Sequence, residues 1–246
     1  MVKNKKIIIA GPCAAETKNG LVQVVEGIHH YVDVIRVGIW KARTCPKSYA
    51  GRGLKALSWV SDLQKKYNTP FAIEVGSREH VKLALQYNIK ILWIGARTTA
   101  NPFSIQEIAE ELRGSDVELW IKNPIFPNLD LFHGAIKRFH LNHCNKLKII
   151  HRGFYDEFNT EYRNSPRWDL LHKIKKSYPS TPIICDPSHI AGQRDLIYPV
   201  AQQALNNDID GLMIEVHHKP EKALSDTKQQ LSIKEFINTL TKLNLK

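Results

Sequence analysis

The chain alternates short, almost continuously apolar runs with longer segments in which apolar residues recur every three or four positions. The short runs are rich in β-branched residues, which is typical of strands that are buried on both faces. Eight such runs occur, at residues 6–11, 33–38, 71–76, 91–96, 118–122, 147–153, 182–186 and 211–216. Alternation of strands with helices predicts parallel strands joined by right-handed crossovers.

Three of the longer segments show the helical spacing of apolar residues most clearly. Their apolar stripes are Leu54, Leu57, Val60 and Leu63; Ile105, Ile108, Ala109 and Leu112; and Ile233, Phe236, Ile237 and Leu240. Ser104 with Glu107 predicts a capping box at the start of the second of these helices. Ser232 with Glu235 predicts another at the start of the third.

Eight strand–helix units in 246 residues predict an α/β fold, a closed (β/α)₈ TIM barrel, that forms a single catalytic domain over residues 1–246. An open, doubly wound sheet is the alternative. The first apolar run is not followed by a GxGxxG segment, which weakens a dinucleotide-binding interpretation of such a sheet.

Composition narrows the class of protein further. A hydrophobic content of 43% allows a sizeable core, and no apolar run approaches the roughly 18 residues of a membrane span. The basic start is followed by only four apolar residues, Ile7 to Ala10, which is too short for a signal peptide. The four cysteines are scattered without a CxxC pair, which argues against a disulfide framework. We therefore expect a cytoplasmic protein.

The formal net charge of +11 fits anionic partners of several kinds, so the positions of the basic residues matter more than their number. In a barrel of this type, active sites lie at the C-terminal ends of the strands. Six basic residues fall there or in the adjoining loops: Arg36, Lys41, Arg43, Arg97, Lys122 and Arg152. Like charges that converge repel one another unless an anion lies between them, so this group predicts a site for phosphate or carboxylate groups.

A second polar group follows the first, seventh and eighth strands, which are neighbours in a closed barrel. It comprises Cys13, His189, Glu215 and Asp226. A thiolate, an imidazole and two carboxylates suit a divalent transition metal ion. The alternative is that Cys13 is a small buried hydrophobic residue and that His189 hydrogen-bonds a loop carbonyl. The other cysteines, Cys45, Cys144 and Cys185, lack such neighbours and are interpreted as packing or loop residues.

Seven motifs, spread over nearly the whole chain, resemble those of 3-deoxy-D-arabino-heptulosonate 7-phosphate (DAHP) synthases, and in particular the branch that is sometimes fused to chorismate mutase. They are GPCAAET (11–17), RVGIWKARTCP (36–46), GARTT (95–99), IKNP (121–124), HRGF (151–154), DPSHIAGQR (186–194) and IEVHHKPEKALSD (214–226). The resemblance implies the first step of the shikimate pathway to aromatic amino acids. In that step phosphoenolpyruvate condenses with erythrose 4-phosphate to give DAHP and phosphate.

The resemblance also implies a role for each matched residue. The metal ligands are Cys13, His189, Glu215 and Asp226. Phosphoenolpyruvate is held by Arg36, Lys41, Arg97, Lys122 and Arg152. The phosphate of erythrose 4-phosphate meets Arg43 and Thr44. Lys41, Cys13 and His189 are the catalytic candidates, with Lys41 as a candidate proton donor.

Partners and cofactor follow from the same resemblance. The metal is divalent, and manganese, iron, cobalt and zinc all suit the mixed ligand set. We expect a homo-oligomer and neither nucleic acid nor membrane as a partner. The chain leaves no room for a regulatory or chorismate mutase domain, so we expect no built-in feedback module and consider a separate chorismate mutase as a partner. One position departs from the family pattern, because Ala42 stands where the family commonly has proline.

Three other functions are less consistent with the sequence. A 3-deoxy-D-manno-octulosonate 8-phosphate synthase, which uses arabinose 5-phosphate, belongs to the same superfamily, but the KARTCP segment favours the four-carbon sugar. A basic nucleic-acid-binding barrel is supported only by the net charge, since the surplus lysines are scattered over helices. A barrel that has lost catalysis is not favoured, because every residue of the predicted site is present.

Overall fold

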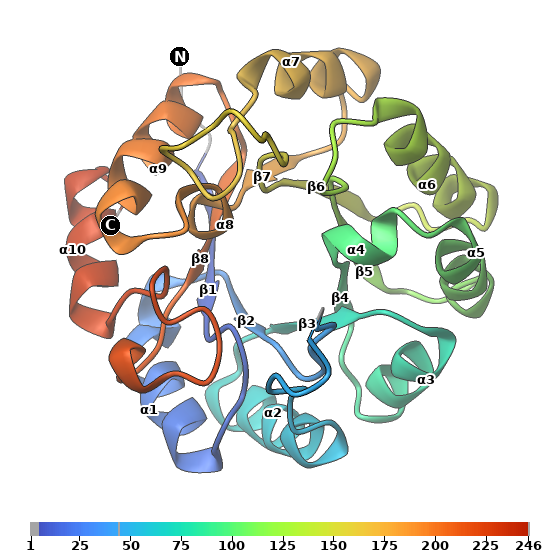
Figure 1. Cartoon of the computed structure of the whole chain (residues 1–246). Helices are drawn as coiled ribbons and strands as arrows, with labels where there is room; N and C mark the ends of the chain where they lie inside the picture. The colour runs from blue at the N-terminus through green and yellow to red at the C-terminus, as the bar shows by residue number, and fades with distance from the viewer. Residues whose placement is uncertain (1–4, 44, 246) are drawn as a thin grey trace.

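The computed structural model describes residues 5–43 and 45–245, which form a closed barrel of eight parallel strands. The strands are β1 (Ile7–Gly11), β2 (Val34–Val37), β3 (Phe71–Val75), β4 (Ile91–Ile94), β5 (Glu118–Lys122), β6 (Leu147–His151), β7 (Ile183–Cys185) and β8 (Gly211–Glu215). Each strand pairs with the next, and β1 pairs with β8 in the register Ile7↔Gly211 to Gly11↔Glu215. The predicted TIM barrel is confirmed, and the open sheet is excluded (Figure 1).

The longer helices surround the strands as an outer ring (Figure 1). They are α1 (Lys18–Ile28), α2 (Leu54–Tyr67), α3 (Arg78–Gln86), α5 (Pro102–Glu111), α6 (Leu129–Leu141), α7 (Trp168–Ser177), α9 (Ile197–Asn206) and α10 (Ile233–Lys242). Two short helices, α4 (Ala96–Thr99) and α8 (Pro187–Ala191), lie inside this ring. Three short 3₁₀ turns are η1 (His29–Tyr31), η2 (Arg194–Leu196) and η3 (Pro220–Lys222). The short helices α4 and α8 directly follow β4 and β7, so they lie at the C-terminal end of the barrel.

One of the two predicted capping boxes is present. At α10, the Ser232 side chain accepts a hydrogen bond from Glu235 N, and the Glu235 side chain accepts one from Ser232 N. At α5 the prediction was wrong, because the helix begins three residues earlier, with Asn101 as its N-cap and Pro102 in its first turn. Proline favours the first turn of a helix, where no N–H is needed, and this signal outweighs the Ser–Glu spacing.

The apolar residues form two separate cores. The larger core lies between the strands and the helices, and the smaller one fills the inside of the barrel. The inner core takes one buried residue from each strand: Ile9, Val34, Ala72, Trp93, Trp120, Ile150, Ile184 and Met213. Because side chains of a strand alternate between its two faces, the residue two positions further on each strand also points inward, in the next layer toward the C-terminal end.

His151, at the end of β6, faces outward and is fully buried beside Trp168 of α7. Its Nε2 lies 2.6 Å from the carbonyl oxygen of Pro166, and its Nδ1 is buried without a hydrogen-bond partner. Burial lowers the pKa of His151 from 6.5 to about 4. The native protein therefore holds this histidine neutral at pH values at which the unfolded chain would protonate it.

This difference predicts acid sensitivity. Between pH 6.5 and about 4 the unfolded chain binds more protons than the native protein, so the free energy of unfolding falls as the pH is lowered through this range. The loss attributable to His151 is on the order of 3 kcal/mol. Urea unfolding of the wild-type protein and of His151→Gln at about pH 7.5 and about pH 4.5 measures it. Equal losses of unfolding free energy in both proteins would contradict the assignment.

Candidate active site

The layer above the inner core is polar. On six strands it carries charged side chains, and on the other two it carries glycine. Its members are Gly11, Arg36, Glu74, Gly95, Lys122, Arg152, Asp186 and Glu215. Apolar residues would stabilise the barrel at these positions at least as well as buried charges do. A charged layer at the C-terminal end of a barrel therefore indicates a functional site.

Ion pairs cross this layer. Lys122 Nζ lies 2.8 Å from Asp186 Oδ2, and Arg36 Nη2 lies 3.0 Å from Glu215 Oε1. Burial lowers the pKa of Lys122, while the Asp186 carboxylate opposes that shift. Burial also lowers the pKa of Arg152 to about 10. Both pairs are at most 5% exposed, so water screens them very little.

A cavity of about 490 Å³ opens above the layer. Its charged lining consists of six cationic side chains, Lys41, Arg43, Arg97, Lys122, Arg152 and Arg163, against the carboxylates of Glu74 and Asp226. Arg43 Nη2 is buried and has no hydrogen-bond partner. A buried cationic donor without an acceptor is costly, and an anion in the cavity would satisfy it.

Beside the cavity, Cys13, Glu215 and Asp226 each place one potential ligand atom within 4.8 Å of the others. Cys13 Sγ lies 3.0 Å from Asp226 Oδ2 and 3.1 Å from Lys41 Nζ. Burial, with the Glu215 carboxylate, raises the pKa of the Cys13 thiol to about 12, so the free thiol donates to Asp226. Gly38 leaves room for this arrangement, because a Cβ there would lie 2.0 Å from the Cys13 carbonyl oxygen.

His189 completes the set of predicted ligands at a slightly greater distance. Its Nε2 lies 4.0 Å from Glu215 Oε1, and its Nδ1 lies 2.8 Å from Asp186 Oδ2. Burial lowers the pKa of His189, so the ring is neutral near pH 7, as a metal ligand must be. A carboxylate that faces the other ring nitrogen is the usual support for a metal-binding histidine.

The residues fit a divalent metal ion. Glu215 Oε1 is buried and accepts no hydrogen bond, although Arg36 lies close to it. One sulfur, one imidazole nitrogen and two carboxylate oxygens converge from three neighbouring strands and their loops. Such a mixed donor set suits manganese, iron, cobalt or zinc. The alternative reading of Cys13 as an ordinary packing residue is less attractive, because its sulfur faces a carboxylate and an ammonium group.

Most of the predicted site residues come together. Lys41, Arg43, Arg97, Lys122, Arg152, His189 and Asp226 line the cavity. Arg36 lies beneath it at 1% exposure, between Glu215 and Asp186, so its predicted contact with substrate stays a prediction. Thr44 lies outside the described residues.

Other residues of the site were missed by the sequence reasoning. They are Glu74, Arg163, Asn164, Asp186, Gln229 and Gln230. Glu74 and Asp186 could have been found, because each stands two positions after an inner-core residue of its strand. Arg163 and Asn164 lie in a long loop between β6 and α7, and nothing in their local pattern predicts that this loop folds back over the site.

The fold and the site together define a (β/α)₈ barrel enzyme with a cavity lined by cationic side chains beside a potential metal site. The chain belongs to the DAHP synthetase I family, whose sequence model matches residues 2–245. It is 30% identical over 240 residues to phospho-2-dehydro-3-deoxyheptonate aldolase of Thermotoga maritima, covering 96% of this chain and 69% of that protein. The predicted family and the enzyme class, 3-deoxy-7-phosphoheptulonate synthase, are confirmed.

Solved structures agree with this assignment. The crystal structure of the Thermotoga maritima DAHP synthase superimposes with a TM-score of 0.88 at 28% identity, over 98% of this chain and 69% of that one. A truncated form of that synthase gives 0.84 at 26% identity, over 98% and 86%. A 2-dehydro-3-deoxyphosphooctonate aldolase of Desulfotalea psychrophila is also similar, with 24% identity over 96% of this chain and 88% of that protein.

Proposed function

We propose that this protein is a metal-dependent DAHP synthase that condenses phosphoenolpyruvate with erythrose 4-phosphate. The observation that carries the proposal is the cavity of about 490 Å³, in which six cationic side chains face a Cys–Glu–Asp cluster. Two phosphorylated substrates bring several negative charges into one site, and the excess of cations over carboxylates matches them.

The cationic residues divide between the two substrates by their position. Lys122 and Arg152 belong to the inward-pointing polar layer, and Arg97 lies on α4 directly after β4. All three line the cavity and are assigned to the phosphate and carboxylate of phosphoenolpyruvate. Arg43 lies in the β2–α2 loop, and its unpartnered Nη2 is assigned to the phosphate of erythrose 4-phosphate. Fixing both substrates in reacting geometry supplies much of the rate gain in a two-substrate condensation.

Lys41 lies where the two halves of the site meet. Its Nζ is 3.0 Å from the Cys13 carbonyl oxygen and 3.1 Å from Cys13 Sγ, and its side chain also lines the cavity. Burial disfavours its charge, but the Cys13 sulfur and the carboxylates of Glu74 and Glu215 raise the pKa of Lys41 overall. The ammonium group is therefore assigned as the proton donor to the developing hydroxyl group.

Cys13, His189, Glu215 and Asp226 are assigned as the metal ligands. A divalent cation held by them would supply Lewis-acid polarisation of the aldehyde oxygen of erythrose 4-phosphate. Thiolate ligation favours soft or borderline ions such as zinc and iron over magnesium.

The acceptor sugar is tested by comparing turnover with erythrose 4-phosphate and with arabinose 5-phosphate. The octulosonate alternative is supported by the similarity to the Desulfotalea psychrophila aldolase, so both sugars are needed. We expect phosphate release from phosphoenolpyruvate only with the four-carbon sugar. Turnover with arabinose 5-phosphate alone would assign the chain to the octulosonate enzymes instead.

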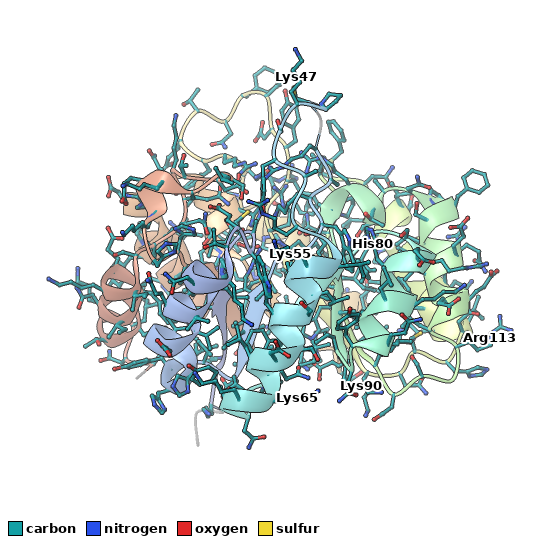
Figure 2. All side chains as sticks on the ribbon, turned by 90° about the horizontal axis from the view of Figure 1, so that it is seen from below. Lys47, Lys55, Lys65, His80, Lys90 and Arg113 are labelled. Atoms are coloured by element: carbon teal, nitrogen blue, oxygen red, sulfur yellow. The ribbon has the colours of Figure 1, made fainter. Side chains whose placement is uncertain are left out.

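The nucleic-acid alternative is weakened by the spread of basic residues over the surface. In Figure 2, Lys47 lies at one end of the molecule, Lys65 and Lys90 lie at the other, and Arg113 lies at the side. A nucleic-acid-binding surface would gather such residues on one face. The described residues also contain no helix that is long and apolar enough to cross a membrane.

Ala42 offers a test of the β2–α2 loop. Proline at this position would restrict the unliganded loop, and no described hydrogen bond is donated by Ala42 N. A compatible substitution by proline commonly contributes about 0.4–1 kcal/mol by limiting alternative conformations. We expect Ala42→Pro to lower the KM for erythrose 4-phosphate by about 2- to 5-fold with little change in the KM for phosphoenolpyruvate. Steady-state kinetics with each substrate varied in turn measures this, and an increase in the sugar KM would contradict it.

A further inference from the structure

Two side chains outside the predicted ligand set connect the two carboxylates of the metal cluster. Gln229 Nε2 donates to Glu215 Oε2 at 2.6 Å, and Gln229 Oε1 accepts from Arg163 Nη1 at 2.5 Å. The same Arg163 Nη1 donates to Asp226 Oδ1 at 2.9 Å. Arg163 and Gln229 thus form a continuous bridge from one carboxylate to the other, called here the Arg163–Gln229 bridge.

The bridge occupies one oxygen of each carboxylate and leaves the other facing the cluster. For Asp226, Oδ1 is taken by Arg163, and Oδ2 faces Cys13 Sγ at 3.0 Å. For Glu215, Oε2 is taken by Gln229. Oε1 accepts no hydrogen bond; Arg36 Nη2 lies 3.0 Å from it as an ion-pair partner, and His189 Nε2 lies 4.0 Å from it. The two remaining oxygens are therefore the ones left to bind a metal ion together with Cys13 Sγ and His189 Nε2.

Glutamine suits this position because its two partners carry opposite charges. The carboxylate of Glu215 needs a donor, and the guanidinium of Arg163 needs an acceptor, so the amide is oriented by charge on both sides. Gln229 is only 1% exposed, so its amide group is shielded from water. Within this contact network, a hydrophobic residue would satisfy neither partner.

The backbone shows that the loop after β8 is held in place. Asp226 has a φ of +49°, a left-handed conformation that costs a non-glycine residue energy and persists only when its surroundings impose it. Arg163 reaches it from a loop seated on α8, where Arg163 N donates to Ala191 O and Asn164 N to Ile190 O. In Figure 1, α8 lies between this yellow loop and the orange-red loop after β8.

We propose that Arg163 and Gln229 are positioning residues that select which carboxylate oxygens of Glu215 and Asp226 bind the metal ion. The inference rests on the proposed function, because it presupposes that the cluster holds a metal. Removing a residue that orients a metal ligand typically weakens metal binding by about 10- to 100-fold. Since both belong to one bridge, loss of either should break the same arrangement.

The test is Mn²⁺ binding by the full chain without substrates, because Arg163 also lines the substrate cavity. The variants are Gln229→Leu, Arg163→Met and the double variant, with Gln203→Leu as the matched control. The Gln203 side chain also accepts a hydrogen bond, from Trp168 Nε1. Gln203 belongs to α9 in the outer ring of helices and not to the metal cluster. Isothermal titration gives the dissociation constants, and Cd²⁺ with its thiolate charge-transfer band reports whether Cys13 remains a ligand.

We expect each single variant to bind Mn²⁺ about 10- to 100-fold more weakly than the wild type, with Gln203→Leu unchanged. The double variant should be no weaker than the worse single variant, because the two residues act as one unit. The Arg163 side chain is 43% exposed, so we expect Arg163→Met to have nearly the same unfolding midpoint as the wild type without metal. This variant therefore still tests the inference if Gln229→Leu folds poorly. Wild-type affinity in Arg163→Met would overturn the inference while leaving the metal site intact, whereas a wild-type protein that binds neither Mn²⁺ nor Cd²⁺ would overturn the metal site as well.

Discussion

Cys13→Ala is expected to lose metal binding and to reduce kcat by about 1000-fold or more. Cys13 contributes the sulfur of the cluster. Without it, the cluster keeps the carboxylates of Glu215 and Asp226 but loses the thiolate ligand that favours a transition metal ion. Lewis-acid catalysis is worth several kcal/mol, and each 1.4 kcal/mol corresponds to about tenfold in rate. The measurement is the initial rate of phosphate release from phosphoenolpyruvate with erythrose 4-phosphate, together with metal content after dialysis.

Cys144→Ala is the matched control for this variant. Cys144 is also buried, but it lies in the loop before β6 and packs in the outer core. Its replacement removes a similar volume, so we expect a modest loss of stability and near wild-type kcat. If Cys13→Ala kept wild-type metal content and turnover, the assignment of Cys13 as a ligand would be wrong.

Lys122→Met is expected to lower kcat/KM for phosphoenolpyruvate by about 100- to 1000-fold. Lys122 Nζ is buried at the floor of the cavity and pairs with Asp186, so its charge acts in a site with little water. Removing one preorganised charge that stabilises a reacting anion commonly costs a factor of this size. Asp186 keeps the hydrogen bond from His189 N and has Arg36 Nη1 at 4.0 Å, so we expect the variant to fold.

Lys148→Met separates this effect from the general loss of a barrel lysine. Lys148 belongs to the neighbouring strand β6 and forms an ion pair with Glu118, but it lies toward the N-terminal end of the barrel. Positions at that end contribute to stability rather than catalysis. Steady-state kinetics should therefore show kcat/KM within about twofold of the wild type for Lys148→Met. Equal losses in both lysine variants would contradict the assignment of Lys122 to substrate.

The barrel was predictable from sequence because its signal is repeated eight times. Each strand is a short apolar run that is buried on both faces, and errors at single boundaries do not change the strand count. The start of α5 shows the limit of local motifs, since two overlapping capping signals compete and only the structure shows that Asn101 is the N-cap. The positions of polar residues at the strand ends then divided them into a basic group and a metal group. The family motifs added the substrate that each basic residue is predicted to bind.

The long loops account for four of the missed residues, Arg163, Asn164, Gln229 and Gln230. Arg163 reaches Asp226 across 63 positions of sequence, and Cys13 N donates to Gln230 Oε1 across 217. Such contacts depend on how the loops after β6 and β8 fold over the end of the barrel, and no periodic pattern encodes that path. Arg36 illustrates a different limit, because its strand position predicts that it points inward but not that carboxylates bind it beneath the cavity.

Phosphate release from phosphoenolpyruvate and erythrose 4-phosphate, before and after removal of bound metal with EDTA, tests the central claim most directly. We expect turnover by the metal-loaded protein, loss of turnover on chelation, and recovery when Mn²⁺, Fe²⁺, Co²⁺ or Zn²⁺ is added back. Recovery should fail in Cys13→Ala, because that variant lacks the sulfur ligand of the cluster. Full turnover by protein shown to be free of metal would contradict the account.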